Sequence, residues 1–427
     1  MKYRSFREHL EKEKARFIEE CDCEGMCLEV CQPLRHLDLG ISNHDLLLKM
    51  VAFLKDGTYS QEVYDFVYAC SLCGCCQNVC HQHINFIAIT EVIKAELNDR
   101  GYKPPPVCSI SLPRGKYNIM RVMESLQISP TERRWVTEIP QNPQPKDVVL
   151  FLSCYVHLMP HIIFTCLDIL ETMGVDFVAI GGVDNCCGYM DLLMGFPEVS
   201  DEFASGLTNA IKAYQPKTAL FLCASCFYRF KYHLPLILDI PFEVKPVHQF
   251  FLENINKVRF SKSLNEKVTY HDSCGLGRRC GLFEEPRNLI RHIPGVELVE
   301  MNPCREKSRC CAGLNLMTNP EVATLMGREL GQVINRTGAD KVITTCTGCF
   351  SILSTIGLQS NFSTEYYVSL MGRAMGIEYE DKLATYRSYG NPKRVLEEAR
   401  DYIDASPFSY EEMENLIPKF FPVNQKV

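Results

Sequence analysis

The hydrophobic positions divide the chain into a helical beginning, a middle of short apolar runs and a helical end. Residues 1–20 are mostly charged, with Phe6, Leu10 and Phe17 as a thin apolar edge, which indicates a solvated helix. Residues 84–100 again place apolar side chains at helical spacing. From Asp147 the pattern changes to short continuous runs such as DVVLFLSC, which are typical of buried parallel strands.

These runs alternate with helical stretches and then repeat. DVVLFLSC, GVDFVAI and KTALFLC are three predicted strands, separated by helices near 158–173 and 200–213. KVTYHDSC, GVELVEM and DKVITTC form a second set of three, and GVDFVAI matches GVELVEM almost position by position. The repeat predicts two duplicated α/β half-domains that face each other about a pseudo-two-fold axis.

Breaks in the pattern predict four regions. They are a helical domain at 1–138, a first half-domain at 147–262, a second at 263–355, and a helical tail at 356–427. The proline-rich stretch IPQNPQPKD marks the first boundary, with Trp135 as a wedge just before it. The tail is expected to wrap over the last sheet, with a docking surface as the alternative.

Composition limits the possible partners and the cellular compartment of the protein. The 427 residues carry a net charge of −7, which argues against a nucleic-acid partner. The first residues lack the apolar segment of a signal peptide, and no run of about 18 apolar residues predicts a membrane span. We therefore expect a reducing, cytoplasmic setting with membrane association only through a partner, so that the 23 cysteines remain available for metal.

Ten of these cysteines form two copies of one pattern: a single cysteine, an adjacent pair, then C-x2-C. Corresponding cysteines lie 120 to 124 residues apart, and each copy begins at the end of a predicted strand. Adjacent cysteines bond each other poorly, and five thiolates exceed the four that a zinc ion takes, so the pattern favours iron–sulfur clusters. The ten are Cys154, Cys186, Cys187, Cys223 and Cys226, then Cys274, Cys310, Cys311, Cys346 and Cys349.

Eight further cysteines predict two 4Fe-4S cubanes in the helical domain. Cys70, Cys73, Cys76 and Cys80 follow the C-x2-C-x2-C-x3-C spacing of ferredoxins, in which the fourth cysteine serves the other cluster. One cubane would then use Cys21, Cys23, Cys27 and Cys80, and the other Cys70, Cys73, Cys76 and Cys31. Cys23 lies one residue before its usual position, where Glu24 stands, and Cys75 is a spare thiol and alternative ligand. Zinc in place of a cubane is the remaining alternative.

The ten-cysteine pattern resembles the CCG (cysteine-rich) domain of heterodisulfide reductases, except that the second copy reads CCAG. Together with the cubane motifs, residues 15–355 resemble the D-type subunit of heterodisulfide reductase, which fuses a ferredoxin-like C-type part with a CCG-containing B-type part. The resemblance implies an α+β fold, in which a helical two-cluster ferredoxin-like domain precedes two Rossmann-like CCG half-domains. It also implies a non-cubane 4Fe-4S cluster in each CCG set, or zinc in one of them.

The implied function is electron transfer through the cubanes to the CCG clusters, which reduce a disulfide within a complex of several subunits. His271 is a candidate proton donor, and Arg278 and Arg279 are candidates for holding an acidic substrate; loop stabilisation is the alternative for each. No GxGxxG follows a strand, so a flavoprotein or other electron donor is expected as a partner subunit. The competing interpretation is an electron conduit from a flavoprotein to a quinone, ferredoxin or another enzyme, as in glycolate, lactate or glycerol-3-phosphate dehydrogenase iron–sulfur subunits. Cys108, Cys166, Cys280 and Cys304 remain unassigned, with burial as small apolar side chains expected.

Overall fold

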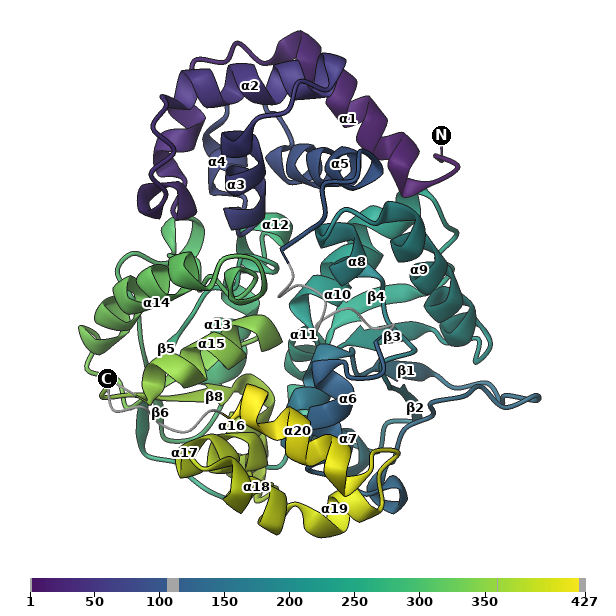
Figure 1. Ribbon diagram of the computed structural model, residues 1–427. Coiled ribbons are helices and arrows are strands. Elements are labelled where there is room, and N and C mark those ends of the chain that lie inside the picture. Colours follow the sequence, from purple (N-terminus) through teal and green to yellow (C-terminus); the bar gives the residue numbers. More distant parts are fainter. Residues whose placement is uncertain (1, 106–114, 359, 422–427) are drawn as a thin grey trace.

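A helical domain rests on two α/β half-domains that lie side by side (Figure 1). The computed structural model describes residues 2–105, 115–358 and 360–421, so Cys108 lies outside the described residues. The mixed helix and sheet content and the duplicated Rossmann-like half-domains confirm the predicted fold class.

The N-terminal domain is helical throughout its described part. Its α-helices are α1 (Phe6–Glu20), α2 (Asn43–Asp56), α3 (Gln61–Ala69), α4 (Cys75–Val79) and α5 (Phe86–Asp99), with short 3-10 turns at Met26–Val30 and Pro33–His36. Ser5, Ser42 and Ser60 cap α1, α2 and α3 by accepting a backbone N–H, so each helix begins at a residue suited to its end. α5 is buried along most of its length because it packs against both α1 and the first half-domain.

The first half-domain has a four-stranded parallel sheet in the order β2-β1-β3-β4. Its strands are β1 (Val148–Phe151), β2 (Phe177–Ile180), β3 (Thr218–Phe221) and β4 (Glu243–Pro246). The helices are α7 (Pro160–Thr172), α8 (Tyr189–Leu193), α9 (Pro197–Lys212), α10 (Ala224–Tyr228) and α11 (Val247–Glu253), and a π-helical turn spans Arg229–His233. β1 is buried at every position, as its continuous apolar run predicts.

The second half-domain repeats this order as β6-β5-β7-β8. Its strands are β5 (Glu266–Tyr270), β6 (Val296–Val299), β7 (Lys341–Thr344) and β8 (Ser363–Tyr366), with helices α12 (Gly277–Cys280), α13 (Glu284–Arg291), α14 (Pro320–Asn335), α15 (Thr347–Gly357) and α16 (Tyr367–Met375). The predicted boundary at residue 355 is therefore too early, because β8 pairs in parallel with β7 and completes the sheet. β4 and β8 were not predicted, since both are short edge strands without a continuous apolar run.

The boundary near residue 138 is too late. Helix α6 (Ile119–Glu124) belongs to the hydrophobic core of the half-domains, and Val136 bridges to Ile180 of β2. Trp135 is buried there, with its ring 5.3 Å from that of His157 in an edge-on contact. The chain thus leaves the N-terminal domain before α6, although a wedge role for Trp135 fits its position.

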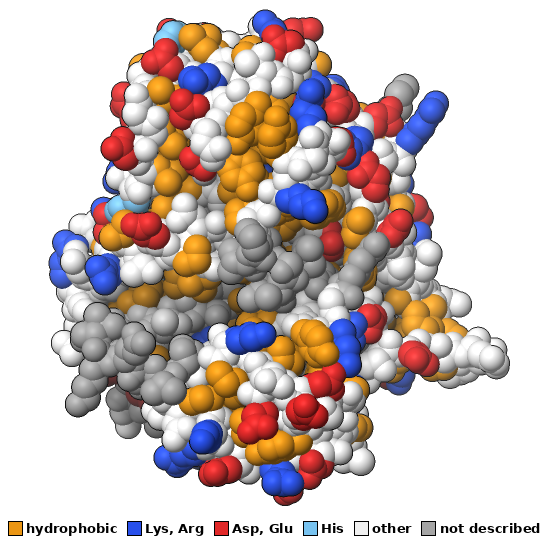
Figure 2. Space-filling model, in the orientation of Figure 1, with side chains coloured by type: hydrophobic (Ala, Val, Ile, Leu, Met, Phe, Trp, Pro, Cys, Tyr) orange, Lys and Arg blue, Asp and Glu red, His pale blue; other side chains and the backbone are white. Residues whose placement is uncertain are grey.

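The tail continues as α17 (Lys382–Tyr389), α18 (Pro392–Glu398), α19 (Arg400–Asp404) and α20 (Tyr410–Phe420). It crosses to the first half-domain and α6, since the Tyr386 hydroxyl donates to the Leu126 carbonyl at 2.9 Å. Acidic and basic side chains are interspersed on the face shown in Figure 2. No helix within the described ranges has both the length and the apolar character that a membrane crossing needs.

Candidate metal centres and the cavity between the half-domains

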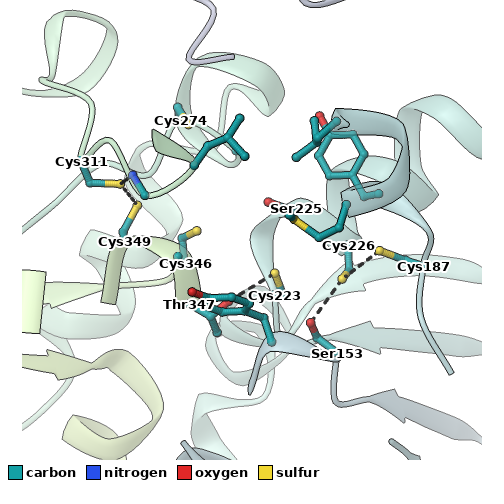
Figure 3. Close-up of a pocket in the computed structure, with 18 of the residues that line it drawn as sticks. Ser153, Cys187, Cys223, Ser225, Cys226, Cys274, Cys311, Cys346, Thr347 and Cys349 are labelled. Carbon is teal, nitrogen blue, oxygen red and sulfur yellow. Dashed lines mark hydrogen bonds between the residues drawn. The ribbon is translucent and has the colours of Figure 1, made fainter. Parts of the chain in front are cut away.

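One cavity of about 120 Å³ collects all ten cysteines of the duplicated pattern. Each sheet delivers its cysteines in the loops after three of its strands, β1, β2 and β3 or β5, β6 and β7, on the carboxyl side where open α/β sheets place their sites. Figure 3 shows the two sets opposite each other, with Cys274, Cys311, Cys346 and Cys349 from the second half-domain facing Cys187, Cys223 and Cys226 from the first. The duplication thus produces one shared cavity rather than two separate sites.

The two sets have the same internal geometry. Cys187 Sγ lies 3.3 Å from Cys226 Sγ in the first set, and Cys311 Sγ lies 3.0 Å from Cys349 Sγ in the second. Hydrogen bonds from Cys186 and Cys226 lower the pKa of Cys187. In the second set, hydrogen bonds from Cys310 and Cys349 lower the pKa of Cys311 in the same way. A lowered pKa favours the thiolate, which is the form that binds metal.

The loop after each cysteine pair keeps its shape despite the CCAG departure. Ala312 adopts a left-handed φ of +61°, close to the +72° of Gly188 at the equivalent position. Position 188 has room only for glycine, because a Cβ there would lie 2.2 Å from the Ser200 carbonyl oxygen. The Gly188 and Ala312 backbone N–H groups then donate to the sulfurs of Cys186 and Cys310, each at 3.4 Å.

This donor set fits iron–sulfur clusters. No described cysteine forms a disulfide, and four Sγ–Sγ separations between neighbouring cysteines, 3.0 to 4.0 Å, exceed a bonded S–S length of about 2.05 Å. Backbone N–H groups aimed at the sulfurs are a known means of tuning such clusters. Five converging thiols per set also exceed the requirement of a tetrahedral zinc ion.

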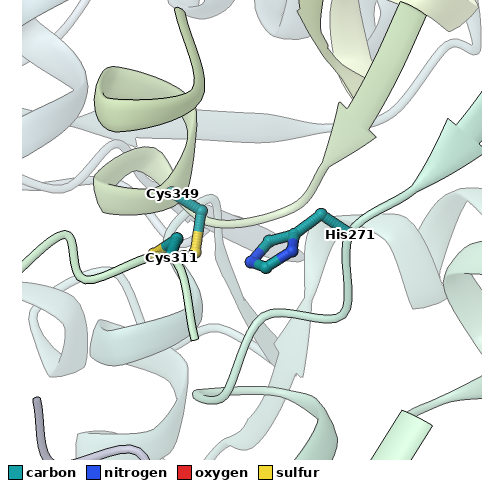
Figure 4. A group of neighbouring side chains, drawn as sticks. All are labelled: His271, Cys311 and Cys349. Atoms are coloured by element: carbon teal, nitrogen blue, oxygen red, sulfur yellow. Dashed lines mark hydrogen bonds between the residues drawn. The ribbon is translucent and has the colours of Figure 1, made fainter. Parts of the chain in front are cut away.

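His271 distinguishes the second set from the first. Its ring points from the end of β5 toward Cys311 and Cys349 (Figure 4), and one ring nitrogen and both sulfurs lie within 4.8 Å of one another. All three residues are buried. Counting back from the first cysteine of each set, Phe151 takes the corresponding place in the first half-domain. Only the second set therefore has a proton-bearing ring at this position beside its sulfurs.

The N-terminal cysteines gather as the exchanged pattern predicts, although their ligation stays a prediction. Cys31, Cys70, Cys73 and Cys76 line one small cavity together with the spare Cys75. Burial, followed by the charges of Cys70 and Cys73, raises the pKa of Cys31. Cys31 therefore lies with the cysteines of the second motif rather than with Cys21, Cys23 and Cys27, which precede it in the sequence.

Cys21, Cys23, Cys27 and Cys80 form the other group. Burial and then the charge of Cys80 raise the pKa of Cys27 to about 11, which shows that these two thiols are neighbours. Cys23 compensates for its irregular spacing with a left-handed φ of +60°, which leaves its sulfur 4.0 Å from that of Cys21. Cys75 instead lies beside Cys73, so Cys23 suits the first group better than Cys75 does.

The N-terminal domain meets the second half-domain at its cysteines. Cys73 and Cys310 are hydrogen-bonding neighbours and share one apolar cluster with Cys311. Arg278 of α12 secures this junction by donating to the Cys73 carbonyl at 2.8 Å and to the Ser308 carbonyl at 2.8 Å. Arg278 does not line the cavity between the half-domains, so its contacts support the loop-stabilising alternative rather than substrate binding.

Arg279 is the charged side chain that lines the cavity. It donates to the Tyr189 hydroxyl at 2.8 Å and to the Leu72 carbonyl, and thereby joins all three parts of the molecule. Sequence reasoning missed Tyr189 and also Thr347, whose hydroxyl donates to Cys223 Sγ across the interface at 3.7 Å. Tyr189 ends NCCGY and Thr347 lies inside CTGC, and that adjacency to the cysteines is the signal that could have identified them.

The unassigned thiols behave differently from one another. Cys166 is fully buried in α7, as expected of a small apolar side chain. Cys280 and Cys304 are only partly buried, so the same expectation is wrong for them. None of the three lines the shared cavity.

Comparison with known proteins agrees with this geometry. The family model described as "Cysteine-rich domain" (CCG) matches residues 148–231 and 268–354, so the chain is a tandem CCG-domain protein. The chain is 32 % identical over 333 residues to the D-type subunit of the dihydromethanophenazine:CoB–CoM heterodisulfide reductase of Methanosarcina barkeri, with 74 % of this chain and 80 % of the relative covered. It belongs to the family of these D-type heterodisulfide reductase subunits.

More distant similarities extend the class. The B-type subunit of the fumarate reductase (CoM/CoB) of Methanothermobacter marburgensis is 27 % identical, over 67 % of this chain and 56 % of the relative. The EtfAB:quinone oxidoreductase of Syntrophomonas wolfei is 25 % identical, over 52 % of this chain and 33 % of the relative. The crystal structure of a hypothetical protein from Helicobacter pylori has the same fold, with a TM-score of 0.52, 11 % identity, and 81 % of this chain and 69 % of that chain covered.

Proposed function

We propose that the chain carries electrons from two cubanes in its N-terminal domain to clusters held by the ten CCG cysteines, and reduces a disulfide in the shared cavity. The observation that carries this proposal is the convergence of all ten cysteines on one cavity. When bound, such clusters supply one-electron transfer and soft iron sites with affinity for thiolate sulfur. The eighteen cysteines predicted as ligands would hold them in four sets.

The order of the sets follows from the contacts between cysteines. Cys73 of the second cubane set lies against Cys310, so the N-terminal domain adjoins the second CCG set directly. Cys27 of the first cubane set contributes to the raised pKa of Cys76, after burial and the nearer thiols of the second. The first cubane set would therefore lie behind the second, as seen from the CCG cavity.

The cavity walls suit a disulfide substrate. Met190, Leu193, Leu314 and Met317 provide apolar surface that excludes water, while Arg279 provides a positive charge at one side. Reduction of R–S–S–R′ consumes two electrons and two protons and releases two thiols. His271 does not line the cavity itself but lies beside Cys311 and Cys349, and it is the candidate proton source on that side.

Titration of the reduced chain with the CoB–CoM heterodisulfide tests this function. We expect the anaerobically purified protein to contain about 16 irons if all four clusters are filled, and to be reoxidised with two electrons per disulfide. Hydroxyethyl disulfide, which is uncharged and offers nothing for Arg279 to pair with, serves as the comparison. Absence of reoxidation by any disulfide, in a protein with full iron content, would contradict disulfide reduction.

A second candidate is an electron conduit without its own substrate. The match to the EtfAB:quinone oxidoreductase, a relative whose name contains no disulfide, favours it. In that case a quinone or a partner flavoprotein would reoxidise the reduced chain, whereas the heterodisulfide would not. The same titration therefore separates the two candidates.

A further inference from the structure

A surface groove of about 920 Å³ lies where α4 of the N-terminal domain faces residues 303–309 of the second half-domain. Five of its twelve lining residues flank predicted cubane ligands. Val30 and Gln32 flank Cys31, Cys75 and Gln77 flank Cys76, and Val79 precedes Cys80. The groove thus reaches the backbone around ligands of both cubanes from outside.

Only one layer of side chains separates this groove from the interior. Cys75 lines the groove and also the inner cavity that contains Cys31, Cys70, Cys73 and Cys76. Gln32 donates to Cys75 Sγ at 3.6 Å and accepts from the Cys310 backbone N–H at 2.9 Å. Because electron tunnelling weakens steeply with distance, this thin wall favours electron exchange with a partner that occupies the groove.

The groove is basic although the whole chain is acidic. Arg35, Lys307 and Arg309 line it against a single carboxylate, that of Glu306, whereas the chain carries a net charge of −7. Arg309 pairs with Glu329 at 2.9 Å. Arg35 and Lys307 are exposed and form no ion pair within the described ranges, so both charges remain available to a partner.

The groove also contains apolar surface. The side chain of Val79 is 53 % exposed and lines the groove at the end of α4. An apolar centre with a charged rim is the usual composition of a protein–protein contact, and transient electron-transfer contacts are small. A groove of this size with unpaired cations fits a protein surface of opposite charge.

The geometry points to this groove as the docking site of a small acidic electron-carrier protein, whose carboxylates surround its own redox centre. The inference deepens the proposed electron transfer and rests on it. The carrier would give one electron at a time to the cubane behind Cys75, and the cluster in the carrier would be oxidised as the cubane is reduced. The positive rim would accelerate the encounter and hold the two redox centres at their shortest separation.

Charge reversal in the complete, iron-loaded chain tests this inference. The probe is a reduced, strongly acidic two-cluster 4Fe-4S ferredoxin, with stopped-flow absorbance as the measurement. The double variant Arg35→Glu/Lys307→Glu should lower the second-order rate constant at low ionic strength by at least about tenfold, and added salt should shrink that difference. Lys262→Glu/Lys393→Glu makes the same charge change at exposed positions outside the groove and should cost little.

Reduction by dithionite distinguishes a loss of docking in the groove from a loss of electron acceptance by the clusters. We expect all three proteins to be reduced by dithionite at the same rate and to contain the same iron. Equal ferredoxin rates for the groove variant and the unaltered chain, or an equal loss in the control variant, would overturn the docking site. Reduction of the unaltered chain by dithionite but not by the ferredoxin would overturn it as well, whereas failure with both reductants contradicts the proposed function itself.

Discussion

The thiol of Cys73, in the N-terminal domain, lies against the thiol of Cys310 in the second half-domain. This contact joins a predicted cubane ligand to a predicted CCG ligand, and Arg278 fixes the backbone on both sides of it. It makes the second half-domain the part of the shared cavity that adjoins the N-terminal cysteines.

Replacement of Cys73 tests this junction. Cys73→Ala should remove one cubane and lower the iron content by about four per chain, because the loop loses a ligand at its centre. Reoxidation by disulfide should slow strongly, while the first cubane keeps its EPR signal. Cys166→Ala is the matched control, since that thiol is fully buried in α7 and does not line the cavity. An unchanged iron content in Cys73→Ala would contradict its role as a ligand.

We expect replacement of Arg278 to affect the free energy of unfolding rather than substrate binding. Arg278→Ala leaves the buried carbonyls of Cys73 and Ser308 without their donor, which should cost about 2–4 kcal/mol of unfolding free energy. Arg278→Lys keeps the charge but loses the planar fork, so it should recover only part of that loss. Chemical denaturation measures both variants. A normal stability combined with weaker disulfide binding would instead restore the predicted substrate role.

His271 should affect proton delivery without affecting cluster assembly. We expect His271→Asn to keep its full iron content and to lower the rate of disulfide-dependent reoxidation by on the order of 100-fold. His292→Asn changes an exposed histidine of the same half-domain and should leave both readouts unchanged. Loss of iron in His271→Asn would assign the ring to a metal instead.

Glu91 predicts an unusual dependence of stability on pH. Burial in α5 raises the pKa of its carboxyl group from 4.5 to about 7, although Arg229, Arg279 and Lys94 oppose the shift. Between these pH values the unfolded chain loses this proton and the folded chain keeps it, so the free energy of unfolding falls as pH rises. Glu91→Gln should therefore be more stable at pH 8, by up to roughly 3 kcal/mol, and equal to the unaltered chain at pH 4.

Glu124 provides the opposite case for the same measurement. Burial opposes ionisation there too, but His157 and Arg133 lower the pKa of Glu124 overall. Glu124→Gln should then be destabilised at pH 8, where the unaltered carboxylate is paired. Denaturant unfolding at pH 4 and pH 8 compares the two variants, and a shared sign at pH 8 would contradict the assignment of Glu91.

Sequence reasoning predicted the central strands because burial on both faces imposes continuous apolar runs. β1 and β3 carry such runs directly before Cys154 and Cys223, so one pattern located both the sheet and the site. β4 and β8 escaped prediction because their residues, EVKP and STEY, form no continuous apolar run, unlike those of the edge strand β2. The boundaries near 138 and 355 failed for a related reason, since α6 and β8 join their half-domains through tertiary packing.

The sequence could not distinguish the roles of Arg278 and Arg279. Arg278 and Arg279 are adjacent in a helical turn, so their side chains diverge: Arg278 reaches the loop of Cys73, and Arg279 lines the cavity beside Tyr189. The exchange of Cys31 and Cys80 between the N-terminal groups was predictable, because the ferredoxin spacing carries it. Contacts between residues far apart in the sequence leave no comparable spacing signal.

The presence of His271 in one half-domain and Phe151 in the other shows how an internal gene duplication has diverged. After such an event the twin copies are free to specialise, provided that their common frame survives. One copy has a phenyl ring at this position, and the other has an imidazole and adjoins the cysteines of the N-terminal domain. A chimera in which either copy replaces the other should assemble correctly and still be a poor catalyst.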